Sequence, residues 1–146
     1  MSEYGDNIWG ALEDFGDGVS GKRLVRTRES HLVAAVWELQ PEAEPTPYHL
    51  HHGTDEYLFV LRGTPTLRTP DGERELAEGE AVQFPRGRAG AHQLINRSDG
   101  AVRVVIAAYH GTPEVIEYPD EGAVIVGSRT PGHDGEPLSR RFPGGA

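Results

Sequence analysis

Short apolar segments separated by turns of Gly, Pro and Asp recur along most of the chain. The segments at 31–39, 57–61, 81–84 and 101–109 are four to nine residues long. Such lengths, with frequent branched and aromatic side chains, are typical of β-strands, although a short helix fits residues 31–39 nearly as well. Strand-like segments at intervals of about 8–12 residues, with no helical pattern between them, predict an all-β sandwich or barrel.

One hairpin is strongly indicated by its turn. Pro70, Asp71 and Gly72 separate two strand-like segments at 66–69 and 73–76. Asp-Gly between such segments is a frequent hairpin sequence, because both residues tolerate a positive φ. The sequence therefore predicts that these two segments pair in an antiparallel manner.

The length of 146 residues suits one domain, which the pattern divides into three parts. Residues 1–22 are acidic and rich in Gly, and we interpret them as an N-terminal arm, with a mostly loose terminus as the alternative. Residues 23–118 carry the predicted barrel. Residues 119–146 form a C-terminal extension expected to be partly irregular, with a short edge strand at 123–126 and an irregular tail from residue 128.

Charge and composition argue against several classes of protein. The net charge is −9, from 14 basic and 23 acidic residues, and without a basic run the chain is expected to bind neither nucleic acid nor anionic membranes. No apolar stretch is long enough for a transmembrane helix, and the N-terminus lacks an apolar signal-peptide segment, so a cytoplasmic location is expected. The absence of Cys excludes disulfides, thiolate metal ligands and a Cys nucleophile.

The densest group of candidate chemical residues follows three prolines. His49 and His51 are separated by one residue, and Asp55 and Glu56 come shortly afterwards. Side chains at i and i+2 of a strand point to the same side, about 7 Å apart, so both imidazoles could reach one metal ion. A nearby carboxylate would complete a facial set with open positions. His52 is expected to point away from His49 and His51, either into solvent or against one of the metal-ligating residues.

Two motifs place these residues in a family. The first runs His49-x-His51, Glu56, Gly63, and the second runs Gly79, Pro85-x-Gly87, His92, Asn96. Together, over about residues 30–118, they resemble the two motifs of the cupin superfamily of small jelly-roll barrels. Tyr48-His49-Leu50-His51 with Tyr118-Pro119-Asp120 is also similar to small single-domain bacterial cupins of unsettled activity. The resemblance implies an antiparallel jelly-roll β-barrel.

The same resemblance implies a ligand set for one divalent transition metal: His49, His51, Glu56 and His92. Glu56 is favoured over Asp55, which another spacing of the motif would select. The second motif departs from the family, because four residues rather than two separate Gly87 from His92. Gly90 relaxes the backbone of this longer loop, which allows His92 to return to the barrel. The first motif also departs, with Ala43 where the family usually has Gly.

The resemblance leads to a functional expectation with one alternative. The leading hypothesis is a metalloenzyme of the oxygenase, isomerase or lyase type that acts on a small polar organic molecule, with Glu56 as a candidate catalytic base. The ligand set suits Fe, Mn, Co, Ni, Cu or Zn without choosing among them. The alternative is a binding module that holds a small ligand or a metal without turnover. A homodimer is expected, because the sheet edges and the aromatic N-terminal arm offer surfaces for a second copy.

Overall fold

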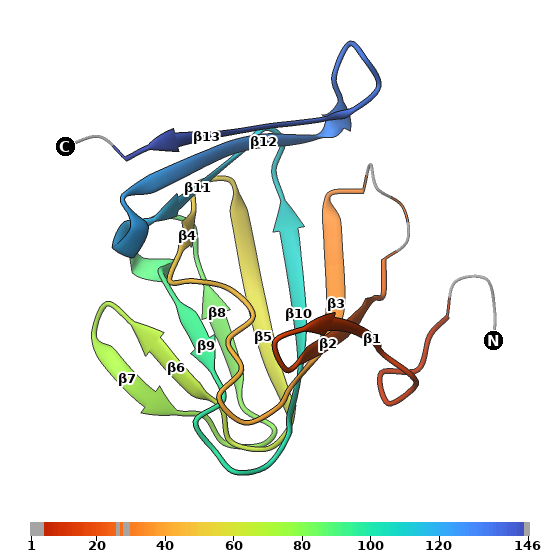
Figure 1. Ribbon diagram of the computed structural model, residues 1–146, viewed down its shortest axis with the longest axis vertical. Coiled ribbons are helices and arrows are strands. Elements are labelled where there is room, and N and C mark those ends of the chain that lie inside the picture. Colours follow the sequence, from red (N-terminus) through yellow and green to blue (C-terminus); the bar gives the residue numbers. More distant parts are fainter. Residues whose placement is uncertain (1–4, 26, 28–29, 145–146) are drawn as a thin grey trace.

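The computed structural model describes residues 5–25, 27 and 30–144. The regular structure of the described chain consists of β-strands (Figure 1) and two short 3₁₀ helices, joined by turns and loops. The elements are β1 (Glu13–Gly16), β2 (Val19–Arg23), β3 (Leu32–Leu39), β4 (Leu50–His51), β5 (Thr54–Arg62), β6 (Thr66–Thr69), β7 (Gly72–Glu75), β8 (Ala81–Phe84), η1 (Arg88–Gly90), β9 (Gln93–Ile95), β10 (Val102–His110), β11 (Glu114–Tyr118), η2 (Pro119–Glu121), β12 (Ala123–Pro131) and β13 (Pro137–Pro143).

Three antiparallel sheets build the barrel. The largest has the order β1-β2-β3-β10-β5-β8, a second has the order β13-β12-β11-β4, and a third has the order β7-β6-β9. The predicted antiparallel jelly-roll barrel is therefore confirmed. Among the described residues, no helix is long and apolar enough to cross a membrane.

The core lies between the sheets and is filled by the inward faces of their strands. In β10, Val102 and Val104 are fully buried, and Val104 lies opposite Val60 of β5. Leu39 of β3 and Leu67 of β6 belong to the same apolar cluster. The strand predicted at 101–109 and the strand predicted at 31–39 are both confirmed, as β10 and β3. Alternation places the side chains of each strand on two faces, and Val36, on the opposite face of β3 from Leu39, is also fully buried.

The predicted hairpin is also present. β6 pairs with β7 in a register that places Thr69 opposite Gly72, so Pro70 and Asp71 form the turn. Gly72 has a φ of 112°, a conformation that side-chain-bearing residues rarely adopt. The turn chemistry identified in the sequence therefore sets the register of this sheet.

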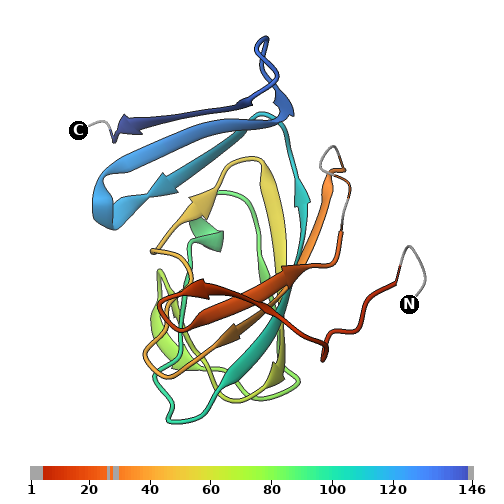
Figure 2. The same cartoon turned by 45° about the vertical axis from the view of Figure 1, so that its right-hand side comes forward.

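The two ends of the chain are more regular than the sequence suggests. β1 and β2 form a hairpin, and β2 pairs with β3, so the expected N-terminal arm is part of the largest sheet. Residues 1–4 lie outside the described part. β12 and β13 form a second hairpin across one end of the barrel (Figures 1 and 2), where an irregular tail was expected from residue 128. All seven residues of β13 are exposed, and its middle three are the polar residues Ser139, Arg140 and Arg141, so this strand lacks the apolar alternation that reveals a strand in a sequence.

Candidate metal centre

Two histidines from the two sequence motifs are locked together by their backbones. His49 and His92 form an isolated antiparallel bridge, in which the His49 amide donates to the His92 carbonyl at 3.1 Å and the His92 amide donates back at 2.9 Å. Residues directly opposite one another in an antiparallel pair project to the same face. The two rings accordingly lie with their centroids 4.5 Å apart.

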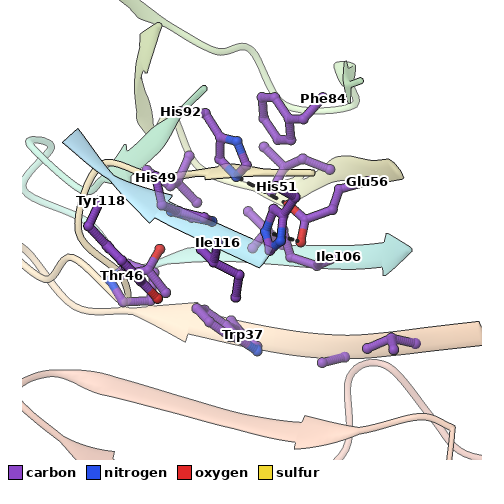
Figure 3. Close-up of a pocket in the computed structure, with 16 residues that line it drawn as sticks. Trp37, Thr46, His49, His51, Glu56, Phe84, His92, Ile106, Ile116 and Tyr118 are labelled. Carbon is purple, nitrogen blue, oxygen red and sulfur yellow. Dashed lines mark ion pairs between the residues drawn. The ribbon is translucent and has the colours of Figure 1, made fainter. Parts of the chain in front are cut away.

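His51 and Glu56 are supplied by neighbouring strands. His51 lies on β4, opposite Ile116 of β11, and Glu56 lies on β5, opposite Ala108 and Phe84. The chain reverses at Gly53, which brings β5 back beside the histidines. Figure 3 shows the rings of His51 and His92 directed at the Glu56 carboxylate.

All four predicted residues meet in one place. Ligand atoms of His49, His51 and Glu56 lie within 4.8 Å of one another. The two carboxylate oxygens of Glu56 divide between two rings, with Oε1 at 3.2 Å from His51 Nε2 and Oε2 at 3.2 Å from His92 Nε2. His49 and His92 are buried, and the side chains of His51 and Glu56 are nearly so. The strand geometry therefore gathers three imidazoles and one carboxylate from both motifs.

The outer nitrogens of two rings are fixed by backbone carbonyls. Nδ1 of His49 lies 2.7 Å from the Pro47 carbonyl, and Nδ1 of His92 lies 2.8 Å from the Gly90 carbonyl. A carbonyl oxygen only accepts hydrogen bonds, so both Nδ1 atoms carry a proton. In the neutral rings Nε2 then holds the free lone pair, as in metal-binding histidines oriented by a second hydrogen bond.

With this tautomer, the contact between His92 and Glu56 indicates what belongs between the two side chains. A neutral His92 directs the lone pair of Nε2 at an anionic oxygen 3.2 Å away. Two acceptors at that distance repel each other unless a proton or a cation lies between them. Both ring nitrogens of His51 are buried and form no hydrogen bond of good geometry, although Nε2 is close to Glu56. The donor set therefore fits a divalent cation held by nitrogen and oxygen.

The electrostatics of the site favour an ionised Glu56 and a neutral His49. Burial, followed by the proximity of His92, lowers the pKa of His49 to about 4. Burial alone would raise the pKa of Glu56, but its contacts with His51 and His92 outweigh burial and lower it. For His51 burial works in the lowering direction, and the contact with Glu56 raises the pKa overall. An ionised carboxylate and neutral imidazoles are the forms that ligate metals.

The longer loop of the second motif is accommodated by η1. This 3₁₀ turn (Arg88–Gly90) places Gly90 in a buried position, where an added Cβ would lie 1.7 Å from the Pro85 carbonyl oxygen. Position 90 therefore requires Gly because there is no room for a Cβ. The sequence had instead suggested that the backbone freedom of Gly90 was the reason. The Phe84 ring stacks on the His92 ring with centroids 3.7 Å apart, which fixes the plane of the imidazole.

The neighbouring polar residues point elsewhere. Asp55 faces Arg86, with Oδ2 at 3.4 Å from Nε, and its side chain is 42% exposed, so it is Glu56 that meets the histidines. His52 is exposed and its Nε2 lies 2.6 Å from Oε1 of Glu117. Its expected orientation away from the cluster is confirmed.

A cavity of about 240 Å³ opens onto the four residues. Its walls come from strands of all three sheets and from the loop at residues 45–46, and most of them are apolar side chains. Trp37, Thr46 and Tyr118 are the lining residues, outside the four, whose side chains carry hydrogen-bonding groups (Figure 3). Burial raises the pKa of Tyr118, followed by the effect of Glu121, so its hydroxyl stays protonated at neutral pH.

A buried carboxylate behind His51 was missed by the sequence analysis. Glu114 is 3% exposed and accepts hydrogen bonds from the Gly53 amide at 2.9 Å and from the Thr54 hydroxyl. Its Oε2 lies 3.9 Å from Nδ1 of His51. Neither motif contains Glu114, and only the pairing of β11 with β4 brings it to the site.

Comparison with known proteins identifies the family. A model of the Cupin domain matches residues 35–108, about half of the chain. The chain belongs to the cupin family. A search of curated proteins found no match.

Solved cupin structures extend this similarity. A sugar phosphate isomerase of the cupin superfamily from Silicibacter pomeroyi DSS-3 is 28% identical, with a TM-score of 0.71 over 84% of this chain and 81% of that chain. A protein from Acidithiobacillus ferrooxidans ATCC 23270, for which sugar phosphate isomerase activity has been suggested, is 25% identical, with a TM-score of 0.68 over 84% and 75%. The polyketide cyclase RemF from Streptomyces resistomycificus is 24% identical, with a TM-score of 0.60 over 78% and 84%, which shows a shared fold.

Proposed function

We propose that this cupin binds one divalent transition metal through His49, His51, Glu56 and His92 and acts as a metalloenzyme on a small organic molecule. The observation that carries the proposal is the Glu56 carboxylate, which lies 3.2 Å from Nε2 of both His51 and His92, while backbone carbonyls hold the Nδ1 atoms of His49 and His92. Such a three-nitrogen, one-oxygen set suits Fe(II), Mn, Co, Ni, Cu or Zn.

The chain's own residues define what the site would do. A bound metal would supply Lewis acidity or activate O₂ at its open positions. Glu56 would hold the metal, and its lowered pKa makes it a weak base while both histidines contact it. Tyr118 would donate a proton or a hydrogen bond to an oxygen of the substrate from the cavity wall.

Tyr118 also favours an enzyme over a binding module. Among the described residues that line the cavity, it is the acid/base group additional to the four candidate ligands. A cupin that only binds a ligand would need no such acid/base group. A non-catalytic binding module is the alternative to the proposed enzyme. Turnover that persists undiminished in Glu56→Gln would exclude a role for that carboxylate as base.

Elemental analysis of protein purified without an affinity metal tests the proposal. We expect near-stoichiometric transition metal in the wild type, a loss in His49→Ala/His51→Ala, and no change in His52→Ala, whose side chain points away. Iron would direct the search to O₂-dependent reactions, whereas zinc, nickel or manganese would favour isomerase or lyase chemistry. Absence of metal in the wild type, even after reconstitution, would refute the metalloenzyme.

We propose further that the protein is a homodimer. The support is a row of aromatic and apolar side chains on the outer face of the largest sheet, where Tyr57, Phe59, Tyr109 and Leu32 are 40–58% exposed. Exposed apolar patches of this kind commonly mark protein interfaces. Light scattering of the wild type and of Phe59→Glu would test it, because a buried charge should shift the variant to the monomer.

A further inference from the structure

The cavity beside the candidate metal centre has neither Arg nor Lys among the described residues that line it. Its carboxylate is Glu56, which is anionic. Arg141 lies over the Tyr118 ring at 5.7 Å but does not line the cavity, and it is paired with Glu121. Sites that hold phosphate groups usually supply Arg, Lys or several backbone amides, because a desolvated phosphate is costly without them.

The remaining polar capacity is also small. Apart from the four candidate ligands, only Thr46, Trp37 and Tyr118 offer side-chain hydrogen-bonding groups. A sugar carries several hydroxyls, and each one left without a partner in an apolar cavity costs on the order of 1–3 kcal/mol. The lining therefore rejects a polyol for the same reason that it rejects a phosphate.

The walls match a different class of molecule. Side chains of Val33, Leu58, Val104, Ile106 and Ile116 face the cavity. Apolar walls with a few polar groups that fix orientation are typical of sites for largely apolar ligands. The volume of about 240 Å³ is equivalent to roughly eight waters at about 30 Å³ each. This space suits a molecule built on one ring.

We propose that the cavity takes a small, largely apolar ring compound that carries one or two oxygen donors, such as a phenol or catechol, and that it excludes sugar phosphates. This inference rests on the proposed function, because the oxygen donors would face the metal and Tyr118 while the ring lies against the apolar walls. It sets the chain apart from the activity for which the Silicibacter pomeroyi relative is named.

Fluorescence titration of Zn²⁺-loaded protein tests the inference. The chain has two Trp residues, and Trp9→Phe leaves Trp37 in the cavity wall as the single indole reporter. Zn²⁺ content is measured first on each sample. Catechol should then quench Trp37 saturably, with a Kd at least tenfold lower than that of glucose 6-phosphate.

A matched pair of variants on β3 locates the binding. Ala35 lines the cavity, whereas its neighbour Ala34 lies on the other face of the same strand. Ala35→Leu should weaken catechol binding at least tenfold with Zn²⁺ content unchanged, and Ala34→Leu should leave both unchanged. Thermal melting verifies that each variant folds. If a variant does not fold, the relative affinity of the wild-type cavity for catechol and glucose 6-phosphate still tests the proposed ligand class.

The outcomes separate the two proposals. Equal or tighter binding of glucose 6-phosphate, or no binding of catechol by protein that contains Zn²⁺, would overturn the ligand class and leave the metal site standing. Failure to take up Zn²⁺ or any other transition metal would overturn both.

Discussion

His49 and His92 are joined by two main-chain hydrogen bonds, so the imidazoles of the two motifs cannot move independently. Their Nδ1 atoms each contact a carbonyl two residues earlier in the chain, at Pro47 and Gly90. The same local arrangement is therefore used twice, once on each side of the bridge. The pair forms a rigid half of the site, which His51 and Glu56 complete from β4 and β5.

The first prediction concerns His92, the candidate ligand that the second motif supplies. His92→Ala removes one nitrogen of the set and the ring that Phe84 stacks on. Affinity for Co²⁺ or Zn²⁺ should fall at least about tenfold, because losing even a residue that only orients a ligand costs about 10–100-fold. Calorimetric titration of the metal measures it. His52→Ala is the control, and equal affinities of the two variants would remove His92 from the site.

A second prediction concerns Glu114. Replacement by Ala leaves the Gly53 amide and the Thr54 hydroxyl without their buried acceptor, which should lower the free energy of unfolding by about 1–3 kcal/mol. Urea denaturation measures the change. Glu117→Ala, on the same strand with a side chain 42% exposed, should cost less than about 1 kcal/mol. A Glu114 variant as stable as the Glu117 variant would contradict this.

Glu114 should also matter for the metal. Because it lies behind His51, Glu114→Gln keeps the shape of the side chain but removes its charge near Nδ1. We expect weaker Co²⁺ binding and a shifted Co²⁺ absorption spectrum in this variant, with the spectrum of Glu117→Gln unchanged. Identical spectra in all three proteins would confine Glu114 to a role in stability.

A third prediction concerns Gly90. An Ala side chain there would collide with the Pro85 carbonyl, so η1 and His92 must shift. Gly90→Ala should lower stability by about 1–3 kcal/mol and weaken metal binding. Gly100→Ala provides the control, because an added Cβ there meets nothing within 4 Å. Thermal melting with and without Zn²⁺ measures both effects. Equal melting temperatures of Gly90→Ala and Gly100→Ala under both conditions would contradict the prediction.

A fourth prediction concerns pH in the metal-free protein. The pKa of His49 is about 4 when folded, against an ordinary value of 6.5. Between these values the unfolded chain binds more protons, so this histidine makes stability rise with pH across that window. The raised pKa of His51 acts in the opposite sense, with stability lost only as pH rises above 6.5.

Substitution separates the two histidines. His49→Gln should flatten the gain in stability between about pH 5 and pH 6.5, as measured by urea denaturation in the presence of a chelator. If the free energy of unfolding rises with pH as steeply in this variant as in the wild type, the titration belongs to another group.

Much of the fold and of the site could be predicted because the informative residues are local in sequence. The segments that form β3 and β10 are apolar runs of strand length, the Asp71-Gly72 turn predicts its hairpin, and His49-x-His51 with Glu56 is a compact motif. The C-terminal hairpin was not predictable, because β12 and β13 are joined by backbone pairing and β13 buries no side chain.

The surroundings of the site depend on contacts between distant segments. Glu114 reaches His51 only through the pairing of β11 with β4, and Trp37 lines the cavity only because of the register of β3 with β10. A sequence motif carries no information on either. The apolar character of the cavity likewise depends on residues from many strands that are distant in sequence, so our proposal replaces the expected polar ligand with a largely apolar one.

The pairing of β4 with β11 has a consequence for the newly made chain. β4 has only two residues, and His51 gains its register partner Ile116 only when β11 is present. While the chain emerges from the ribosome, the first motif is therefore exposed long before its histidines can be fixed in place. Metal captured at that stage would meet a flexible peptide, and under the proposed function selection among metal ions would wait until most of the chain has been synthesised.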